Sequence, residues 1–404
     1  MRCGLLGRKL GHSYSPQIHG YLGNYSYELF EKEPDELETF LRSGTFSGIN
    51  VTVPYKKAVI SYLDELTDRA QKVGAVNTVV CRNGKLLGHN TDYFGFETML
   101  LSSKLQVQAK KCLVLGSGGA SNTVVAVLTA YGANVIVISR TGENNYQNLH
   151  LHSDATLIVN TTPVGMYPNV GSSAVNLDHF PALEGVFDVI YNPARTQLLM
   201  DAEKRGLKAL NGLLMLVAQA KEASEWFANT CISDEEIHRI HKILRSQMEN
   251  IVLIGMPGCG KSTIGKIIAE KTGKTFVDAD EAIVASAGMT IPEIFSNSGE
   301  EEFRRIETEV LKELGMRSGL VIATGGGCVT RPKNYESLHQ NGKIFWIQRE
   351  IGALPVDGRP LSQTNDLHRM YEVRKPLYEA FADIVISNDI QPEVAAQQIM
   401  EAHR

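Results

Sequence analysis

The sequence predicts an α/β protein in which parallel sheets form separate domains. Two glycine-rich segments support this prediction, because each follows a strand-like apolar run and precedes a helix-like run. Residues 111–115 run into Gly116–Ser121, and residues 250–254 run into Gly255–Thr263. The length of 404 residues indicates two or three domains at about 150 residues each.

Composition and charge exclude several classes of protein. With 40 Lys and Arg against 45 Asp and Glu, the net charge is −5, and no basic excess favours nucleic acid or an anionic membrane surface as a partner. No apolar run approaches the roughly 20 residues of a membrane helix, and the first residues lack the apolar stretch of a signal peptide. The six cysteines form neither a CxxC pair nor a cluster with histidines, which disfavours structural zinc and disulfides. We expect a cytoplasmic protein that acts on small molecules.

The first glycine-rich segment predicts a β-α-β unit that closes with a strand at residues 134–138. The loop reads G-x-G-x-x-S, so an ordinary strand–helix turn stays an alternative to a dinucleotide site. The segment Ser139-Arg140-Thr141 follows the second strand. An NAD-binding fold has an acidic residue at this place, which binds the ribose, whereas an arginine with hydroxyls suits the 2′-phosphate of NADP(H). The segment therefore predicts a Rossmann-like domain that binds NADP(H). Its expected contacts are Gly116, Gly118, Gly119, Ala120, Ser139, Arg140 and Thr141.

The second glycine-rich segment, Gly255–Ser262, matches the P-loop pattern G-x-x-x-x-G-K-[ST]. Its glycines let backbone N–H groups approach phosphates, Lys261 neutralises phosphate charge, and the Ser262 hydroxyl can bind Mg²⁺. A helix is predicted to follow and to stop at Gly273. A glycine turn with an incidental lysine is the alternative. The expected nucleotide contacts are Gly258, Cys259, Gly260, Lys261, Ser262 and Thr263.

A connecting helix is predicted between the two halves, at residues 229–249. Ser233-Asp234-Glu235-Glu236 has the capping-box pattern, and Ile237, Ile240 and Leu244 fall on one helical face. We therefore place a domain boundary near residue 250.

Further motifs follow the P-loop in a fixed order. They are Asp278-Ala279-Asp280, Gly299–Arg305, Gly325–Gly327, Arg359-Pro360-Leu361 and Arg374–Tyr378. In this order they resemble shikimate kinase over residues 250–404, which implies a P-loop domain like that of nucleoside monophosphate kinases, with ATP and Mg²⁺ as cofactors. The resemblance implies that Asp278 and Ser262 assist Mg²⁺ and that Arg359 belongs to a lid over the phosphates. It assigns substrate binding to Asp280, Arg304, Gly326, Gly327 and Arg374.

The chemistry of phosphoryl transfer agrees with these assignments. An arginine fork suits a carboxylate substrate, Lys261 stabilises phosphate charge, and Asp280 can orient or deprotonate the attacking hydroxyl. The alternative is that Glu300 with Arg304, and Glu301 with Arg305, are solvated helix pairs at i,i+4 spacing. One departure from the family is that the arginine that precedes the lid and stacks on adenine in relatives has no clear counterpart.

The N-terminal half carries a second ordered set of motifs. They are Gly11–His19, Gly48–Lys56, Gly74–Thr78, Asn90–Asp92, Asn160–Met166, Asp188–Pro193 and Gly212–Gln219. They resemble shikimate dehydrogenase over residues 1 to about 228. The resemblance implies a catalytic pair of Lys56 and Asp92 and a cofactor contact at Met166. It implies substrate binding by Ser13, Ser15, Thr52, Asn77, Asp92, Tyr191 and Gln219.

This residue set suits the reduction of a polyhydroxylated keto acid. Neutral hydrogen-bonding groups match the hydroxyls, and hydride transfer creates an alkoxide that a cationic acid such as Lys56 stabilises and protonates. Asp92 would orient Lys56 and bind a neighbouring hydroxyl. The alternatives are a solvated helix start at Lys56, a helix N-cap at Asp92 and a Gln219 side chain bonded to backbone.

Together the two resemblances imply a bifunctional enzyme of aromatic amino-acid precursor synthesis. It would reduce 3-dehydroshikimate to shikimate with NADPH and then phosphorylate shikimate to shikimate 3-phosphate with ATP. The predicted domains are a substrate domain (1–95, rejoined by 215–228), the NADP domain (96–214), the linker helix (229–249) and the kinase domain (250–404). A preference for quinate, decided by the surroundings of Ser13 and Ser15, is one alternative, and a half that binds without turnover is another. We expect a monomer or homodimer.

Overall fold

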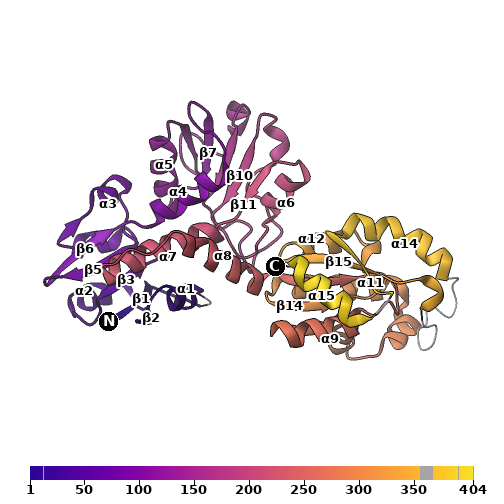
Figure 1. The fold of residues 1–404 in the computed structure, drawn as a ribbon. Helices are drawn as coiled ribbons and strands as arrows, with labels where there is room; N and C mark the ends of the chain where they lie inside the picture. Colours follow the sequence, from indigo (N-terminus) through magenta and orange to yellow (C-terminus); the bar gives the residue numbers. More distant parts are fainter. Residues whose placement is uncertain (12, 355–366, 390, 404) are drawn as a thin grey trace. The chain divides into compact units, whose positions relative to one another are not determined.

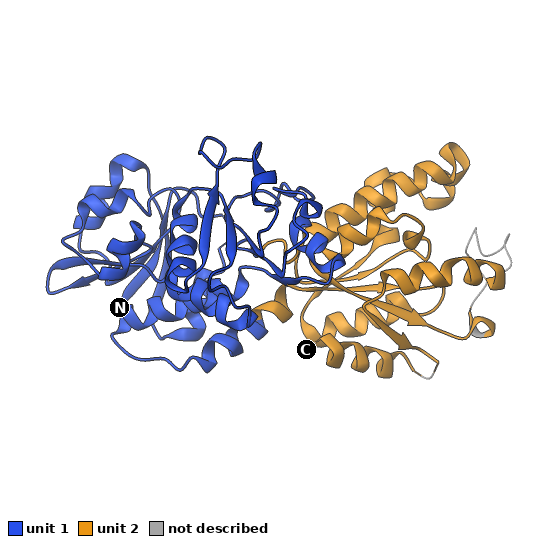
Figure 2. Ribbon diagram, turned by 90° about the horizontal axis from the view of Figure 1, so that it is seen from above, with its two compact units in different colours: residues 1–191, 196–243 blue, residues 192–195, 244–404 orange. Residues whose placement is uncertain are grey.

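The computed structural model describes residues 1–11, 13–354, 367–389 and 391–403, which form two units. Unit 1 comprises Met1–Tyr191 with Thr196–Ile243, and unit 2 comprises Asn192–Arg195 with Leu244–Arg404 (Figure 2). The described residues contain three sheets (Figure 1). None of their helices is long and apolar enough to cross a membrane.

Unit 1 begins with a mixed sheet. Its strands are β1 (Arg2–Gly7), β2 (Ser26–Glu31), β3 (Gly48–Val51), β4 (Glu65–Leu66), β5 (Thr78–Arg82) and β6 (Lys85–His89). Their order is β2-β1-β3-β5-β6-β4, and β5 runs antiparallel to both β3 and β6. Asn83 and Gly84 have φ values of 53° and 78°, the left-handed conformation that a tight hairpin turn between β5 and β6 needs. The helices of this part are α1 (Ser15–Leu22), α2 (Leu37–Arg42) and α3 (Asp68–Val73).

The second sheet of unit 1 is parallel and has a Rossmann-type arrangement. Its strands are β7 (Lys111–Leu115), β8 (Asn134–Ile138), β9 (Leu157–Asn160), β10 (Gly185–Asp188) and β11 (Lys208–Leu210). The predicted strands at residues 111–115 and 134–138 are confirmed as β7 and β8, with the same first and last residues. The order β11-β10-β9-β7-β8 puts the change of winding direction between β7 and β9. Ligands bind outside the carboxyl ends of the strands at such a point, and the Gly116 loop lies there.

Helices cover both faces of this sheet, which is why residues 112–115 of strand β7 are apolar on both sides. Cys112 and Val114 face one core and Leu113 and Leu115 the other, and all four are fully buried. The helices are α4 (Asp92–Ser103), α5 (Gly119–Ala130) and α6 (Gln197–Lys204). Helix α7 (Leu213–Ala228) packs closely on α4, since a Cβ at Gly95 would lie 2.6 Å from the Met215 carbonyl oxygen. Figure 1 shows α7 between the two sheets of unit 1.

The division between the units falls inside helix α8 (Glu235–Met248). Ile237, Ile240 and Leu244 are buried, as their shared face predicts. The finer domain limits proposed from the sequence stay predictions.

Unit 2 is built on a parallel sheet. Its strands are β12 (Asn250–Ile254), β13 (Thr275–Asp278), β14 (Leu320–Ala323), β15 (Gly342–Gln348) and β16 (Ile384–Ser387). The order is β13-β14-β12-β15-β16, so the P-loop leaves the central strand β12. The helices are α9 (Lys261–Thr272), α10 (Ala279–Ala287), α11 (Ile291–Met316), α12 (Lys333–His339), α14 (Leu367–Phe381) and α15 (Pro392–His403). The predicted strand 250–254 and the stop at Gly273, with φ 73°, are confirmed.

Helix α11 is broken at Gly299, where φ is 78° and ψ is 179°. Only glycine adopts this conformation readily, so the helix restarts at Glu300. The restart agrees with the prediction that residues 299–305 open a helix, and it places Arg304 in the first turns of the new segment.

Candidate active sites

Lys56 and Asp92 form an ion pair in unit 1. The Lys56 Nζ lies 2.6 Å from Asp92 Oδ2, and the two side chains are 19% and 10% exposed. Asp92 is the first residue of α4 and Thr91 occupies the N-cap position, so the N-cap alternative for Asp92 is wrong. Lys56 is paired and partly buried, whereas Lys57 is exposed, so the solvated-start alternative is wrong for Lys56.

The glycine loop of the Rossmann-type sheet reaches the same place. A Cβ at Gly119 would lie 3.6 Å from Lys56 Cδ, so the lysine stem contacts the start of α5. At Gly116 φ is 106°, and a Cβ there would meet Thr161 Oγ1 at 2.8 Å. The backbone therefore passes close to neighbouring residues without side chains in the way, and the N-terminus of α5 can face an anion.

The remaining expected cofactor residues lie along the same edge of the sheet. The Gly116 N–H donates to the Ile138 carbonyl at 2.8 Å, which joins the loop to the end of β8. Arg140 and Thr141 follow this end and are exposed, and Met166 is 44% exposed in the segment after β9. Gly118 and Ser139 belong to the same two loops, and Ala120 stands in the first turn of α5. A glycine cradle with a free helix N-terminus and a nearby arginine fits a phosphorylated dinucleotide.

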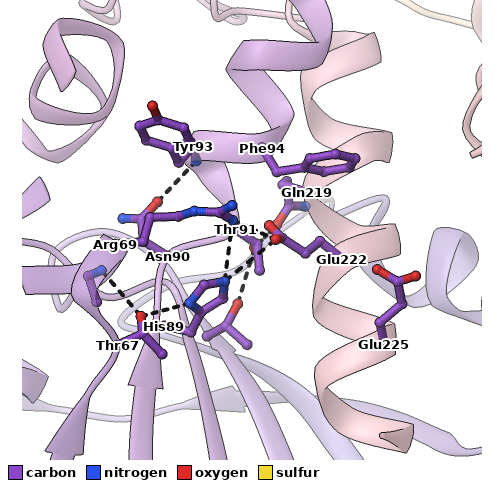
Figure 3. Close-up of polar contacts among 12 residues, drawn as sticks. Thr67, Arg69, His89, Asn90, Thr91, Tyr93, Phe94, Gln219, Glu222 and Glu225 are labelled. Atoms are coloured by element: carbon purple, nitrogen blue, oxygen red, sulfur yellow. Dashed lines mark hydrogen bonds and ion pairs between the residues drawn. The ribbon is translucent and has the colours of Figure 1, made fainter. Parts of the chain in front are cut away.

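Polar side chains of the mixed sheet and α7 converge on Thr91. Asn77 Nδ2 donates to Thr91 Oγ1 at 3.0 Å, and the Thr91 N–H donates to Asn77 Oδ1 at 2.7 Å. Thr91 Oγ1 also lies 3.5 Å from Gln219 Oε1 (Figure 3). The Gln219 Nε2 donates to the Leu216 carbonyl at 2.8 Å, so the alternative of a backbone bond is confirmed for this group. The structure thus brings Asn77 and Gln219 to the segment that ends in Asp92.

The expected substrate residues near the N-terminus connect to this group through buried side chains. The Ser15 N–H donates to Ser13 Oγ at 3.2 Å, and the rings of Tyr14 and Tyr191 meet edge to face at 6.1 Å. Tyr27, which hydrogen-bonds Ser15, donates its hydroxyl to Asn50 Oδ1 at 2.7 Å. Asn50 Nδ2 donates to Thr78 Oγ1 at 3.2 Å, and Thr78 Oγ1 lies 3.2 Å from Thr91 Oγ1. Thr52 follows β3, and its N–H donates to the Leu6 carbonyl at 2.9 Å.

From the sequence, no site role was expected for Tyr27, Asn50, Thr78 or Thr91, although the last three lie within the quoted motifs. Asn50 had a signal, because it is polar within the otherwise apolar strand β3. Tyr27 had none, since it lies on another strand and only the fold brings it to Asn50.

His19 lies beneath this network and is 1% exposed. Its Nδ1 is 2.6 Å from the Tyr25 hydroxyl, and its ring stacks on Tyr27 at 4.0 Å between centroids. Burial lowers the pKa of His19 from 6.5 to about 3. A histidine held neutral in this way is a structural residue and not an acid or base of the reaction.

We expect unit 1 to lose stability as the pH falls below 6.5. In the unfolded chain His19 is protonated below about pH 6.5, whereas in the folded chain it stays neutral down to about pH 3. The free energy of unfolding should therefore be lower by about 2 kcal/mol at pH 5. Urea unfolding of the wild type and of His19→Gln at pH 7.5, 6.5 and 5.5 measures this difference. The variant should show the flatter pH dependence, and His150→Gln, at an exposed position, should not differ from wild type. Equal slopes for wild type and His19→Gln would contradict the assignment.

A cluster of charged and aromatic side chains links α7 to α3 and β6 (Figure 3). Arg69 Nη1 lies 2.5 Å from Glu222 Oε1, and His89 Nε2 lies 3.4 Å from the arginine and 3.6 Å from the carboxylate. His89 Nδ1 is 2.8 Å from Thr67 Oγ1, and the histidine ring stacks on Trp226. Glu222 stands one turn after Gln219, so this cluster fixes the part of α7 that faces Thr91.

We expect Arg69 and Glu222 to stabilise the fold as a pair. Glu222→Gln leaves the arginine beside His89 without its carboxylate, and the coupling energy in a double-mutant cycle with Arg69→Met should be about 1–2 kcal/mol. The exposed pair Lys85 and Glu65, 2.6 Å apart, is the control and should couple by less than about 1 kcal/mol. Urea unfolding measures both cycles, and equal couplings would show that burial gives the inner pair no advantage.

Unit 2 contains a cavity of about 790 Å³ that the P-loop borders. Gly255, Gly258 and Gly260 have φ values of 144°, 84° and 100°, which turn the loop so that its N–H groups can face phosphates. Lys261 Nζ donates to the carbonyls of Gly255 and Met256 at 2.9 and 3.0 Å. Among the other expected contacts, Thr263 lines the cavity, while Cys259 is buried behind the loop.

Ser262 and Asp278 form a pair of oxygen ligands beside the P-loop. The Ser262 hydroxyl donates to Asp278 Oδ2 at 2.7 Å, and Asp278 Oδ1 accepts from the Asp280 N–H at 3.0 Å. Among the described residues no group of three or more His, Cys, Asp or Glu side chains could hold a metal. Mg²⁺ usually takes only one or two protein oxygens and completes its shell with waters and phosphates, so this pair fits it.

The opposite side of the cavity carries arginines. Arg304 is 5% exposed, and its Nη1 lies 2.7 Å from Oε2 of the fully buried Glu307. Arg374 Nη1 and the Tyr378 hydroxyl donate to the Gly326 carbonyl at 3.1 and 2.5 Å. A Cβ at Gly327 would collide with the Arg304 guanidinium. Arg304, Arg374, Gly326 and Gly327 line the same cavity as Asp280 and can hold a carboxylate and hydroxyls.

The solvated-pair alternative is wrong for Arg304, because the guanidinium is buried and its closest partner is Glu307 and not Glu300. It is also wrong for Glu301, which pairs with Arg331 and not with Arg305. Burial raises the pKa of Glu307 despite the neighbouring arginine.

From the sequence, no site role was expected for Glu307 or for Tyr378, although Tyr378 ends the motif Arg374–Tyr378. Glu307 stands at i+3 from Arg304, a spacing that places the two side chains together on a helix. Arg359 lies outside the described residues.

The folds and sites define an enzyme with two nucleotide-dependent centres, a Rossmann-type dehydrogenase and a P-loop phosphotransferase. The sequence model of the shikimate dehydrogenase substrate binding domain matches residues 5–79, and that of shikimate kinase matches residues 257–404. A shikimate dehydrogenase (NADP(+)) of Clostridium beijerinckii is 34% identical over 267 residues, which cover 61% of this chain and 98% of that protein. The chain belongs to the shikimate dehydrogenase family and carries a shikimate kinase domain.

Solved structures agree with this assignment. A chorismate mutase/shikimate 5-dehydrogenase fusion protein from Clostridium acetobutylicum superposes with a TM-score of 0.57 at 35% identity, covering 60% of this chain and 96% of that chain. A shikimate 5-dehydrogenase from Thermus thermophilus, solved in complex with NADP(H) and shikimate, gives a TM-score of 0.55 at 30% identity, covering 60% and 99%.

Proposed function

We propose that the chain catalyses two consecutive reactions, the NADPH-dependent reduction of 3-dehydroshikimate to shikimate and the ATP-dependent phosphorylation of shikimate to shikimate 3-phosphate. The first assignment depends on Lys56, which forms an ion pair with Asp92 and contacts the start of α5. The cavity shared by the P-loop and the buried Arg304 carries the second. The Thermus thermophilus relative solved with NADP(H) and shikimate supports both ligands of the first site.

In the dehydrogenase site, NADPH supplies a hydride when it is bound. Lys56 donates a proton to the oxygen of the reduced carbonyl, and its charge stabilises the alkoxide that hydride transfer creates. Asp92 orients the ammonium at 2.6 Å, and Asn77 and Gln219 bind hydroxyls of the substrate. Ser13, Ser15, Thr52 and Tyr191 complete the proposed substrate contacts. Arg140 favours NADPH over NADH because it can pair with the 2′-phosphate.

In the kinase site, ATP with Mg²⁺ supplies the phosphoryl group when it is bound. Lys261 and the P-loop N–H groups neutralise and position the phosphates, and Ser262 and Asp278 hold the metal. Arg304 and Arg374 bind the substrate carboxylate, and Gly326 and Gly327 let it approach the backbone. Asp280 orients or deprotonates the attacking hydroxyl.

The test is a paired assay on the purified full chain. NADPH oxidation with 3-dehydroshikimate measures the first reaction, and ADP release with Mg·ATP and shikimate measures the second. Both rates should be present in one preparation, and quinate with NADP⁺ should react more slowly than shikimate. A preparation that binds MgADP or NADPH without turnover would assign a binding role to that half. The cytoplasmic location and the monomeric or dimeric state are part of this proposal and stay predictions.

A further inference from the structure

Strand β10 of the Rossmann-type sheet ends in a fully buried carboxylate, that of Asp188, beside the end of β9. The Met166 segment, residues 161–166, follows β9 and includes the expected cofactor contact. The Tyr191 segment, residues 189–191, follows β10 and ends at an expected substrate contact. A carboxylate is stable away from water only where hydrogen-bond donors of the protein replace the water. The donors around Asp188 therefore show what its side chain holds in place.

The donors come from three different segments of unit 1. Asn160 Nδ2 and the Ile190 N–H donate to Asp188 Oδ1 at 3.1 and 3.0 Å. Ile190 belongs to the Tyr191 segment, and Asn160 directly precedes the Met166 segment. The Thr196 hydroxyl donates to Asp188 Oδ2 at 2.8 Å, and Thr196 is the N-cap residue of α6. The side chain of Asp188 thus joins the ends of two strands to the start of a helix.

Asn160 extends this network into the Met166 segment. Its Oδ1 accepts hydrogen bonds from the N–H and from the hydroxyl of Thr162, at 3.0 and 2.7 Å. The segment also passes close to α6 at Gly165, where φ is 88° and a Cβ would lie 3.4 Å from Thr196 Cβ. Asn160 and Thr196 are themselves buried. The positions of the two segments relative to each other therefore depend on the hydrogen bonds of one carboxylate.

We propose that Asp188 is a positioning residue of the dehydrogenase, which holds the Met166 segment and the Tyr191 segment in a fixed relative position. The inference rests on the proposed function, in which the cofactor contacts the first segment and the substrate contacts the second. Hydride transfer needs both reactants in alignment, and a misplacement of about 1 Å can lower such a rate by about 10²-fold. Asp188 is fully buried, so it acts through the two segments and not by contact with a ligand.

The charge of Asp188 gives this role a measurable signature. Burial raises the pKa of Asp188 from 3.8 to about 6, although hydrogen bonds from the neutral Ile190, Thr196 and Asn160 lower it in part. Above this pH the carboxylate accepts all three hydrogen bonds. Below it, one carboxyl oxygen becomes a donor and can no longer serve as a full acceptor. Asparagine has a donor group in place of one oxygen, so Asp188→Asn resembles the protonated state at every pH.

The test is a single turnover of the full chain, in which protein loaded with NADPH is mixed with excess 3-dehydroshikimate in a stopped-flow instrument. The amplitude counts the working sites, and the rate constant reports how well the reactants are aligned. For Asp188→Asn at pH 7.5 we expect the rate constant to fall roughly tenfold. A residue that only stabilised the fold would change the amplitude and leave the rate constant as in wild type.

The pH profile of the same rate constant is the second measurement. In wild type it should fall as the pH is lowered through about 6, whereas in Asp188→Asn it should stay low and change less with pH. Asp178→Asn makes the same substitution at an exposed position between β9 and β10. This matched control should follow the wild type at every pH.

The donor on α6 tests the link from its other end, even where Asp188→Asn does not fold. Thr196→Val removes the hydroxyl that bonds Asp188 Oδ2, so it should also lower the rate constant several-fold. Thr196→Ser keeps the hydroxyl and should recover the rate constant to within twofold of wild type. Rate constants within twofold of wild type in both Asp188→Asn and Thr196→Val would overturn the proposal. Identical pH profiles of wild type and Asp188→Asn would overturn it too.

Hydrogen exchange tests the link without any substrate. In Asp188→Asn the backbone amides of residues 161–166 should exchange roughly fivefold faster than in wild type, the size of one lost hydrogen bond. Unchanged exchange in this segment would contradict the role given to Asp188. A wild type that does not oxidise NADPH with 3-dehydroshikimate refutes the proposed function, while the exchange measurement still tests the link between the segments.

Discussion

Lys56→Met should lower the kcat for the reduction of 3-dehydroshikimate by about 10²–10⁴-fold, the range for loss of a positioned general acid. Methionine preserves the stem that contacts Gly119 but has no proton to donate and no charge to stabilise an alkoxide. Stopped-flow or steady-state NADPH oxidation measures the loss. Shikimate phosphorylation by the same preparation should remain at the wild-type rate.

Lys57→Met is the matched control, because Lys57 is the exposed neighbour of Lys56. It should keep the wild-type rate within about twofold, as for a surface substitution without partners. If Lys56→Met retains more than a tenth of the wild-type kcat, another group donates the proton, and the pair with Asp92 is structural.

Lys261→Met should reduce kcat/KM for shikimate phosphorylation by about 10²–10³-fold, as expected when one preorganised charge is removed from a transition state. Its Nζ lies 2.9 Å from the Gly255 carbonyl and 3.0 Å from the Met256 carbonyl, so the side chain is already directed along the loop that holds the phosphates. A coupled ADP-release assay measures the change. The dehydrogenase rate should be unaffected.

Lys271→Met tests an exposed lysine on the same helix, α9, and should leave the kinase rate within twofold of wild type. A Lys261→Met variant that phosphorylates shikimate at more than a tenth of the wild-type efficiency would contradict the role given to this lysine. Thermal unfolding of both variants separates loss of catalysis from loss of the fold.

Local sequence patterns predicted the parallel sheets well. The strands at residues 111–115, 134–138 and 250–254 were predicted to the residue, because each is an apolar run that ends at a glycine or polar residue. The mixed sheet of unit 1 was harder to predict. Its strand β4 has only two residues, and the antiparallel pairing of β5 depends on contacts with β3 that lie far apart in the chain.

In the candidate sites, too, contacts between distant segments of the chain could not be predicted from the sequence. The P-loop pattern itself indicated Lys261, while the family resemblance that the other motifs carry implied the roles of Lys56, Asp92 and Asp278. The groups that hold these segments together come from distant parts of the chain: Arg69 meets Glu222 across 153 positions. No local sequence pattern indicates this ion pair, because only the fold brings the two residues together.

Helix α7 has a consequence for the way the protein is made. Its residues belong to the first part of unit 1 in space, since the Tyr25 hydroxyl donates to Ser224 Oγ at 2.8 Å and Phe227 packs in the core with Cys3 and Val80. In the chain, however, α7 comes after the whole parallel sheet of that unit. A nascent polypeptide that has left the ribosome only as far as residue 212 therefore lacks a wall of the substrate domain and lacks Gln219. Unit 1 is completed late in synthesis, shortly before the P-loop begins to emerge.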